Sequence, residues 1–238
     1  NTSIWSDVVV SSTGVFYAAM QSTAGNNKGF HRSEDGLNWT NITPSNFPGV
    51  HVRSVMALAT SNENILYTLS ETPGNGMPNE PNNPSEYTSL WKYTYGSGNG
   101  AGANGTWEDR SAGLPSDNFW NSYTSFTGYC TGIAVKPDNS DIVFMGGSNM
   151  FRSTNGFATP EQTSQIEGYN AQGYTNFNWQ TDNHHPDLHH ITFRPDNPDY
   201  LLCSTDGGLH FTEDCEAFRV EWESYNNGFV TTQFYAVS

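Results

Sequence analysis

The chain has 238 residues, of which 14% are aromatic and 23 are glycine, while 24 aspartates and glutamates outnumber 9 lysines and arginines. The formal charge of −15 would repel phosphate backbones and anionic lipid surfaces, which argues against nucleic acid as a partner. No stretch approaches eighteen apolar residues, so no membrane span is predicted, and Gly, Pro, Asn or Asp interrupts every helical pattern. The composition therefore predicts an all-β fold of short strands.

Four consecutive segments repeat the order strand, turn, strand, strand, tryptophan-bearing strand, which is typical of β-propeller blades. In the third and fourth segments, near-identical turns at 137–141 and 195–199 join the first two strands. We expect four-stranded antiparallel blades at about 3–46, 51–115, 129–182 and 187–226.

The second blade is irregular, with insertions at 72–86 and 96–105 that are rich in Pro, Asn, Gly and Ser. Both are expected to be exposed loops, and Trp107 is expected on the outer strand. Residues 232–238 resemble the start of a further inner strand. We therefore expect a fragment of a larger ring of seven or eight blades and a longer natural chain, since four blades would leave exposed edges.

A loop at 116–128 carries several aromatic residues, including Trp120 and Tyr123. Aromatic side chains gathered in one loop predict either ligand contact or packing of the loop onto its own blade, and the sequence leaves both open.

The pattern Ser33-x-Asp35-Gly36-x-x-Trp39 resembles the Asp-box of BNR, or sialidase-like, propellers. Weaker copies are Ser153-x-Asn155-Gly156 and the segment ending at Asp214. In such a turn the Asp or Asn accepts backbone N–H bonds, Gly adopts a positive φ, and Trp packs between blades. The resemblance implies a structural role for these residues, and we expect the preceding Arg32 and Arg152 to hold structural strand positions.

A second resemblance rests on the fourth blade, in His185-x-Asp187-x-His189, Asp206-Gly207-Gly208 and Gln233-Phe234-Tyr235. These residues are similar to BNR or sortilin-like repeat proteins of secreted bacterial origin. Such proteins include xyloglucanase-like glycoside hydrolases and surface proteins exported by a type IX secretion route. The resemblance implies an extracellular or outer cell-surface location.

On an extended segment, His185, Asp187 and His189 would point to one side. They would then form a metal site or acid–base cluster, or a hydrogen-bonded cluster in which Asp187 orients His189 and Asp206 caps a turn. No cofactor is predicted. Calcium is the alternative suggested by the acidic Asn–Asp turns, whereas imidazole ligands would favour zinc.

Three cysteines are too few for a disulfide framework. Cys203 and Cys215 flank a predicted hairpin, so they either pair or are, like Cys130, buried free thiols.

The leading functional prediction is an extracellular propeller module that acts as a scaffold, an adhesin, or a carbohydrate- or protein-binding part of a larger protein. Its expected partner is a polysaccharide or another surface protein. The alternative is a secreted, xyloglucanase-like glycoside hydrolase, with Asp187 and Asp206 as candidate acids. Such an enzyme needs two carboxylates about 5–5.5 Å apart if retaining, or about 6.5–9.5 Å apart if inverting.

Overall fold

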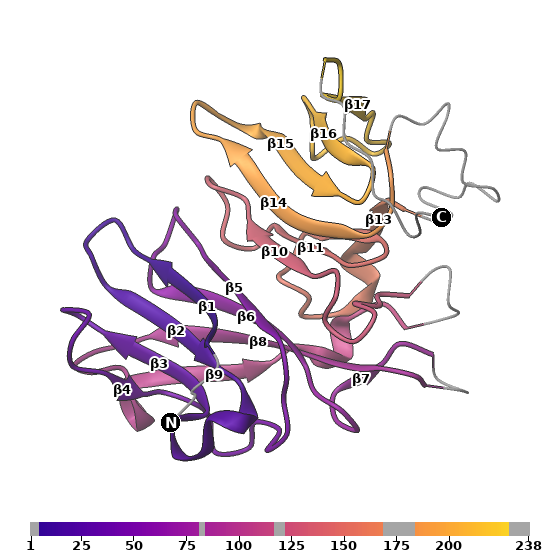
Figure 1. The fold of residues 1–238 in the computed structure, drawn as a ribbon. Coiled ribbons are helices and arrows are strands. Elements are labelled where there is room, and N and C mark those ends of the chain that lie inside the picture. Colours follow the sequence, from indigo (N-terminus) through magenta and orange to yellow (C-terminus); the bar gives the residue numbers. More distant parts are fainter. Residues whose placement is uncertain (1–4, 81–83, 117–121, 169–183, 229–238) are drawn as a thin grey trace, which may run out of the picture.

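The computed structural model describes residues 5–80, 84–116, 122–168 and 184–228. These residues form four antiparallel sheets that follow one another along the chain (Figure 1). The predicted all-β propeller with four blades is therefore confirmed. The helical turns among the described residues are short 3-10 segments: η1 (Ser22–Asn27), η2 (Gly102–Asn104), η3 (Ser111–Gly113) and η4 (Pro160–Gln162).

The first, third and fourth blades are meanders in which neighbouring strands pair in chain order, whereas in the second blade β6 pairs with β8. The first blade contains β1 (Trp5–Val10), β2 (Phe16–Met20), β3 (Gly29–Ser33) and β4 (Thr40–Asn41). The second contains β5 (Ser54–Leu58), β6 (Ile65–Glu71), β8 (Tyr87–Tyr95) and β9 (Gly105–Asp109), with β7 (Met77–Pro78) also paired to β8. The third contains β10 (Gly132–Val135), β11 (Val143–Gly146), β12 (Met150–Ser153) and β13 (Thr163–Glu167). The fourth contains β14 (Leu188–Arg194), β15 (Asn197–Thr205), β16 (Gly208–Thr212) and β17 (Glu223–Ser224).

The hydrophobic core is divided among the three junctions between neighbouring blades. One cluster joins Tyr17 and Phe30 of the first blade to Trp91 of the second. A second cluster lies between blades two and three, and a third lies between blades three and four. Each blade therefore buries one face against its neighbour, which is how short strands of mixed polarity obtain a core.

Polar side chains reinforce these junctions. The indole N–H of Trp107 donates to the carbonyl of Ile42 in the preceding blade at 2.6 Å, and Trp222 donates to Ile166 at 2.9 Å. Buried Arg152 donates from the third blade to the carbonyl of Cys215 in the fourth at 2.7 Å. A buried indole or guanidinium needs such acceptors, so these contacts fix how neighbouring blades are oriented.

The insertion at 72–86 departs from the expected exposed loop. It forms β7, and it buries Met77, Asn79 and Glu86. The second insertion also packs back onto its blade, because Tyr93 donates from its hydroxyl to the carbonyl of Gly100 at 2.7 Å. Composition identified both segments as irregular but did not reveal these contacts.

All three cysteines are buried and free, so Cys203 and Cys215 do not form a disulfide. Within the described residues, no helix is long and apolar enough to cross a membrane. The predicted further strand at 232–238 lies outside the described residues.

Candidate functional site

Tyr129, Asp187, His189 and Asp206, here called the Tyr129 cluster, meet where the third blade adjoins the fourth. Tyr129 lies in the connection that enters the third blade, Asp187 precedes β14, His189 lies within β14, and Asp206 lies in the turn between β15 and β16. The pairing of Leu188 with Thr205 brings the start of β14 beside the end of β15. Ordinary antiparallel register therefore assembles the last three of these side chains.

Asp206 is the centre of the Tyr129 cluster. Its Oδ1 lies 2.7 Å from Nε2 of His189, and the Tyr129 hydroxyl donates to Oδ1 at 3.1 Å and to Oδ2 at 3.2 Å. The rings of Tyr129 and His189 meet edge to face, with centroids 5.1 Å apart. Tyr129 remains 51% exposed, so the cluster presents an open aromatic ring beside hydrogen-bonding groups.

Asp187 is half-buried and lies close enough to Asp206 and His189 for their charges to act on it. Burial raises the pKa of its carboxyl group, and the negative charge of Asp206 raises it further, while His185 and His189 act in the opposite direction. Asp187 is therefore the carboxyl group of the pair that retains a proton to a higher pH than usual.

The geometry differs from the extended segment expected at 185–189. Asp187 has a φ of 65°, so the backbone turns sharply before β14 begins. Nδ1 of His185 lies 2.7 Å from the carbonyl of Pro186, and His189 is bonded by Asp206 rather than by Asp187. A Cβ at residue 207 would lie 2.4 Å from the Cβ of His185, so the close approach of these two segments requires Gly207.

The loop that carries Tyr129 is held from beneath by buried Glu86. This carboxylate accepts hydrogen bonds from the Thr124 hydroxyl at 2.8 Å, from both the N–H and the hydroxyl of Ser125 at 2.6 Å, and from the N–H of Thr127 at 3.1 Å. Arg53 adds bonds to the carbonyls of Gly128 and Tyr129 at 2.7 and 2.9 Å. The second blade therefore fixes the position of a loop that faces the fourth.

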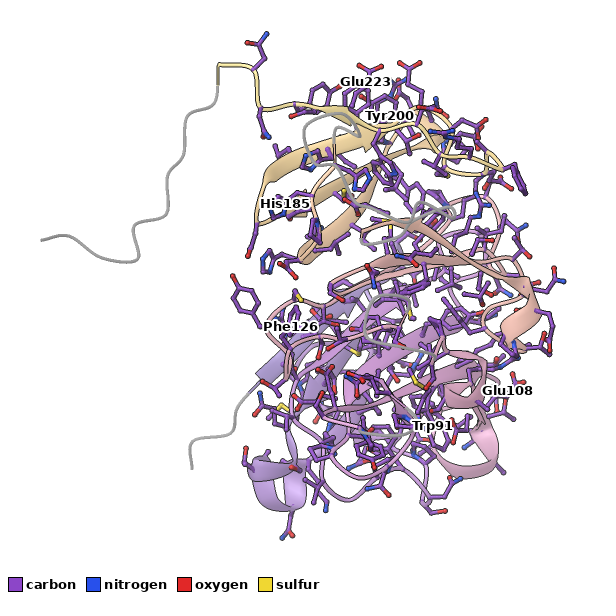
Figure 2. The ribbon with its side chains drawn as sticks, turned by 90° about the vertical axis from the view of Figure 1, so that its right-hand side faces the viewer. Trp91, Glu108, Phe126, His185, Tyr200 and Glu223 are labelled. Atoms are coloured by element: carbon purple, nitrogen blue, oxygen red, sulfur yellow. The ribbon has the colours of Figure 1, made fainter. Side chains whose placement is uncertain are left out.

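The predicted aromatic loop divides into buried and exposed residues. Tyr123 is 1% exposed and its hydroxyl lies 2.7 Å from that of Thr131, which places it in the core rather than on a binding surface. Phe126 is 39% exposed, and Figure 2 shows it on the same edge of the molecule as His185. Trp120 lies outside the described residues. Tyr129 was not predicted as a site residue from the sequence. The one feature that could have indicated it is its position directly after Gly128, in a predicted loop.

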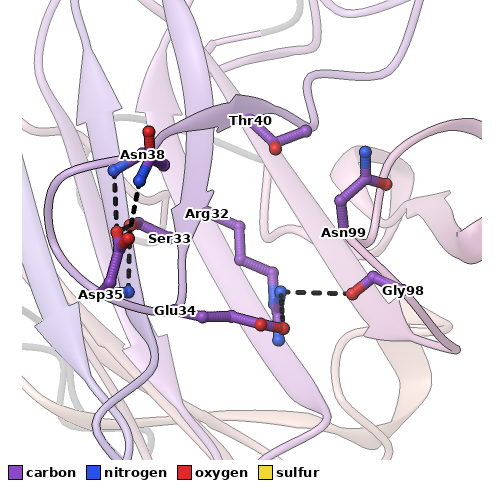
Figure 3. A pocket seen from close by; sticks show the side chains of 8 residues that line it. All are labelled: Arg32, Ser33, Glu34, Asp35, Asn38, Thr40, Gly98 and Asn99. Atoms are coloured by element: carbon purple, nitrogen blue, oxygen red, sulfur yellow. Dashed lines mark hydrogen bonds and ion pairs between the residues drawn. The ribbon is translucent and has the colours of Figure 1, made fainter.

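The first Asp-box-like turn is closed by its own side chains. Asp35 Oδ1 accepts a hydrogen bond from the N–H of Asn38 at 2.7 Å (Figure 3). The same oxygen accepts from the N–H of Leu37 at 2.8 Å, and the Ser33 hydroxyl accepts from the N–H of Gly36 at 2.9 Å. Gly36 has a φ of 72°. These bonds hold a tight turn, and the N–H and side chain of Asn38, together with the N–H of Leu37, keep the pKa of Asp35 well below its usual value.

Equivalent turns follow the third strand of two other blades. In the third blade, the Ser153 hydroxyl lies 2.9 Å from Oδ1 of Asn155, which also accepts from Ala158 N–H at 3.1 Å, and Gly156 has a φ of 62°. In the fourth blade, Asp214 accepts from Glu216 N–H at 3.1 Å. Trp39 differs from the expected inter-blade position, since its indole donates to Gly36 at 3.1 Å within its own turn.

A pocket of about 230 Å³ lies beside the first turn, between the first blade and the 96–105 insertion (Figure 3). Arg32 reaches into it, but its guanidinium is already paired with Glu34 at 3.0 Å and stacks on Tyr95. The Arg32 guanidinium therefore already has partners within the protein. For this reason the Tyr129 cluster is the stronger candidate site.

Comparison with known proteins places the fold in context. No protein-family model matches the chain, and no curated protein sequence matches it. Among solved structures, a GH74 enzyme from Niastella koreensis matches with a TM-score of 0.51 and 18% identity, over 93% of this chain and 30% of that one. The GH74 xyloglucanase from Xanthomonas campestris matches with a TM-score of 0.57 and 16% identity, over 92% of this chain and 30% of that one. YCF48 from Cyanidioschyzon merolae matches with a TM-score of 0.48 and 12% identity, over 86% of this chain and 49% of that one.

The chain therefore spans less than a third of the length of the two GH74 proteins. At these identities the likeness concerns the fold, which is that of a β-propeller.

Proposed function

We propose that this chain is a carbohydrate-binding propeller module of a larger extracellular or cell-surface protein, and that the Tyr129 cluster is its binding surface. The observation that carries this proposal is the exposed ring of Tyr129 held against the carboxylate of Asp206 and the imidazole of His189. The extracellular location and a type IX export route rest on the resemblance of the fourth-blade sequence to secreted proteins.

The chemistry of the cluster suits a sugar. An exposed aromatic ring offers a flat apolar face for the C–H groups of a pyranose, while a carboxylate and an imidazole bond its hydroxyl groups. The surface is also preorganised, because Glu86 and Arg53 fix the loop before any ligand arrives. The polysaccharide substrate named for the Xanthomonas campestris GH74 xyloglucanase makes xyloglucan a sensible first ligand to test.

Glycoside hydrolysis is a second candidate function, favoured by one observation. Asp187 and Asp206 are close enough for the charge of Asp206 to raise the pKa of Asp187, and burial raises it further. A carboxyl group whose pKa is raised, near a second carboxyl group, is part of the arrangement that a glycosidase uses for its general acid. Asp206, however, is already hydrogen-bonded to His189 and Tyr129. A carboxylate held in this way can position a bound ligand as well as take part in hydrolysis.

A polysaccharide screen that includes xyloglucan separates the two functions. Binding is measured by affinity gel electrophoresis and turnover by release of reducing ends, with an Asp187→Ala, His189→Ala double variant beside the wild type. Binding without turnover, weakened in the variant, supports the module. Turnover that the variant loses supports the hydrolase, and wild-type protein that neither binds nor cleaves any polysaccharide contradicts both.

A further inference from the structure

Glu167, Cys203 and His210 form a second cluster, buried between the third and fourth blades and separate from the Tyr129 cluster. Cys203 on β15 and His210 on β16 are direct cross-strand partners, and Glu167 ends β13, the outer strand of the preceding blade (Figure 1). One donor atom from each residue lies within 4.8 Å of the other two. The side chains are 1%, 2% and 4% exposed, respectively, so all three donors converge in the interior.

The contacts within this cluster are loose for hydrogen bonds. Sγ of Cys203 lies 4.0 and 3.9 Å from the two carboxylate oxygens of Glu167, and Nδ1 of His210 lies 3.4 Å from the Thr205 hydroxyl. The Glu167 carboxyl group also accepts a hydrogen bond from the backbone N–H of His185, whereas the thiol is only a weak donor. The carboxyl oxygens, the thiol and the imidazole therefore have donor capacity that a cation could use.

The charges of the donors support a divalent ion. When they bind a metal, a carboxylate and a thiolate together carry two negative charges and a neutral imidazole adds none, so the three ligands balance one divalent cation. Binding of the ion would displace any proton that the carboxyl and thiol groups hold.

The donor types select the metal. Thiolate sulfur disfavours Ca²⁺ and Mg²⁺, whereas a mixture of thiolate, imidazole and carboxylate suits Zn²⁺. Zinc bonds of 2.0–2.3 Å place tetrahedral donors roughly 3.3–3.7 Å apart. The sulfur-to-oxygen distances in this cluster exceed that range by only a few tenths of an ångström, and the chosen donor atoms of all three residues lie within 4.8 Å of one another.

We propose that Glu167, Cys203 and His210 bind a structural zinc ion that links the third blade to the fourth. The Thr205 hydroxyl, 3.4 Å from Nδ1 of His210, would support the imidazole from outside the set of ligands. The ion would take the place of a disulfide as the cross-link between these blades.

Metal analysis of the purified protein after Zn²⁺ loading and dialysis tests the proposal, with Cys203→Ser as the test variant and Cys215→Ser as the matched control. Cys215 is also buried, but it lies after β16 and bonds toward the carbonyl of Pro198. We expect about one zinc per chain in the wild type and in Cys215→Ser, and at least a hundredfold weaker zinc binding in Cys203→Ser. Equal zinc binding by Cys203→Ser, or none by the wild type, would overturn the proposal.

X-ray absorption at the zinc edge of the zinc-loaded wild type is a second test. It needs no variant, so it remains informative even if the Cys203→Ser protein does not fold. We expect one sulfur neighbour at about 2.3 Å and the remaining neighbours at about 2.0–2.1 Å. A spectrum with oxygen and nitrogen neighbours alone would show that zinc binds elsewhere and would overturn the assignment.

Discussion

The hydroxyl of Tyr129 donates to both carboxylate oxygens of Asp206, at 3.1 and 3.2 Å, although the two residues are 77 positions apart. This contact joins the loop that enters the third blade to a turn of the fourth, and it leaves the tyrosine ring half exposed. A surface that spans two blades in this way depends on the contacts that hold the blades in register.

Removing only the Tyr129 hydroxyl should weaken ligand binding modestly. Tyr129→Phe keeps the ring but loses the bonds to Asp206, which for an exposed charged acceptor are worth about 1 kcal/mol. We expect roughly a fivefold weaker polysaccharide affinity by calorimetric titration. An affinity loss as large as that of Tyr129→Ala would mean that the hydroxyl, rather than the ring, dominates binding.

The Glu86 carboxylate, which holds the loop that carries Tyr129, should stabilise the fold although it does not contact the ligand. Glu86→Gln places an amide donor against the hydroxyl and N–H donors of Thr124, Ser125 and Thr127, and we expect a loss of about 2–4 kcal/mol in the free energy of unfolding. Urea denaturation measures this loss.

Glu63→Gln is the matched control for Glu86. Glu63 also accepts bonds from a backbone N–H and a hydroxyl, both from Ser12, but in an exposed setting. We expect it to cost less than about 1 kcal/mol. Similar losses for the two variants would contradict the anchoring role of Glu86.

Lys136 should stabilise the junction of blades three and four at the opposite end of the strands. Its ammonium group is buried and pairs with Asp138 at 2.7 Å and with Asp199 and Glu216 at 2.9 Å. Because these carboxylates are half exposed, Lys136→Met should cost about 1–3 kcal/mol rather than the full cost of a buried pair. Lys92→Met, which breaks a single 3.7 Å pair with Asp141, should cost less.

The same lysine predicts a pH dependence. Burial lowers the pKa of Lys136, but the three carboxylates outweigh burial and leave the pKa above its usual value. The folded state therefore holds the proton more tightly, so the advantage of wild type over Lys136→Met should be constant from pH 7 to 9. It should shrink as the pH rises above about 10.4, where an unfolded lysine deprotonates. Thermal unfolding of both proteins across this range measures the difference, and an advantage that grows in alkali would contradict the ion pairs.

Asp35 predicts the opposite dependence, in acid. Its lowered pKa means that the folded state favours the carboxylate, so its contribution is present above about pH 4 and lost as the pH falls through the folded pKa. Asp35→Asn should fold with the same turn, as Asn155 does in the third blade, but should lose less thermal stability between pH 4 and 2. Identical acid profiles for the two proteins would contradict this account.

The sequence was sufficient to predict the propeller because its signals are local. The turns at 137–141 and 195–199 and the Ser33–Trp39 pattern depend on residues within a few positions of one another, and Trp107 lies on the expected outer strand. Contacts between blades were not predictable in this way. Glu167 contacts Cys203, which is 36 residues away in the sequence. The periodicity of residues within one blade does not specify the position of that blade relative to the next.

The candidate site was only partly predictable for the same reason. His189 and Asp206 were selected from a motif, and strand register brings them together. The motif did not reveal the positive φ of Asp187, which turns this residue away from an extended path. Tyr129 was missed because one tyrosine in an irregular loop has no pattern of its own.

Polysaccharide retardation in affinity gels, compared for wild type, Tyr129→Ala and Phe218→Ala, tests whether the Tyr129 cluster binds carbohydrate. Phe218 is a fully exposed aromatic residue, and its segment follows Cys215, which bonds to Asp199 at the far end of β15 from Asp206. We expect a polysaccharide to retard the wild type and Phe218→Ala equally, whereas Tyr129→Ala migrates freely. Equal retardation of all three proteins would contradict binding at the Tyr129 cluster.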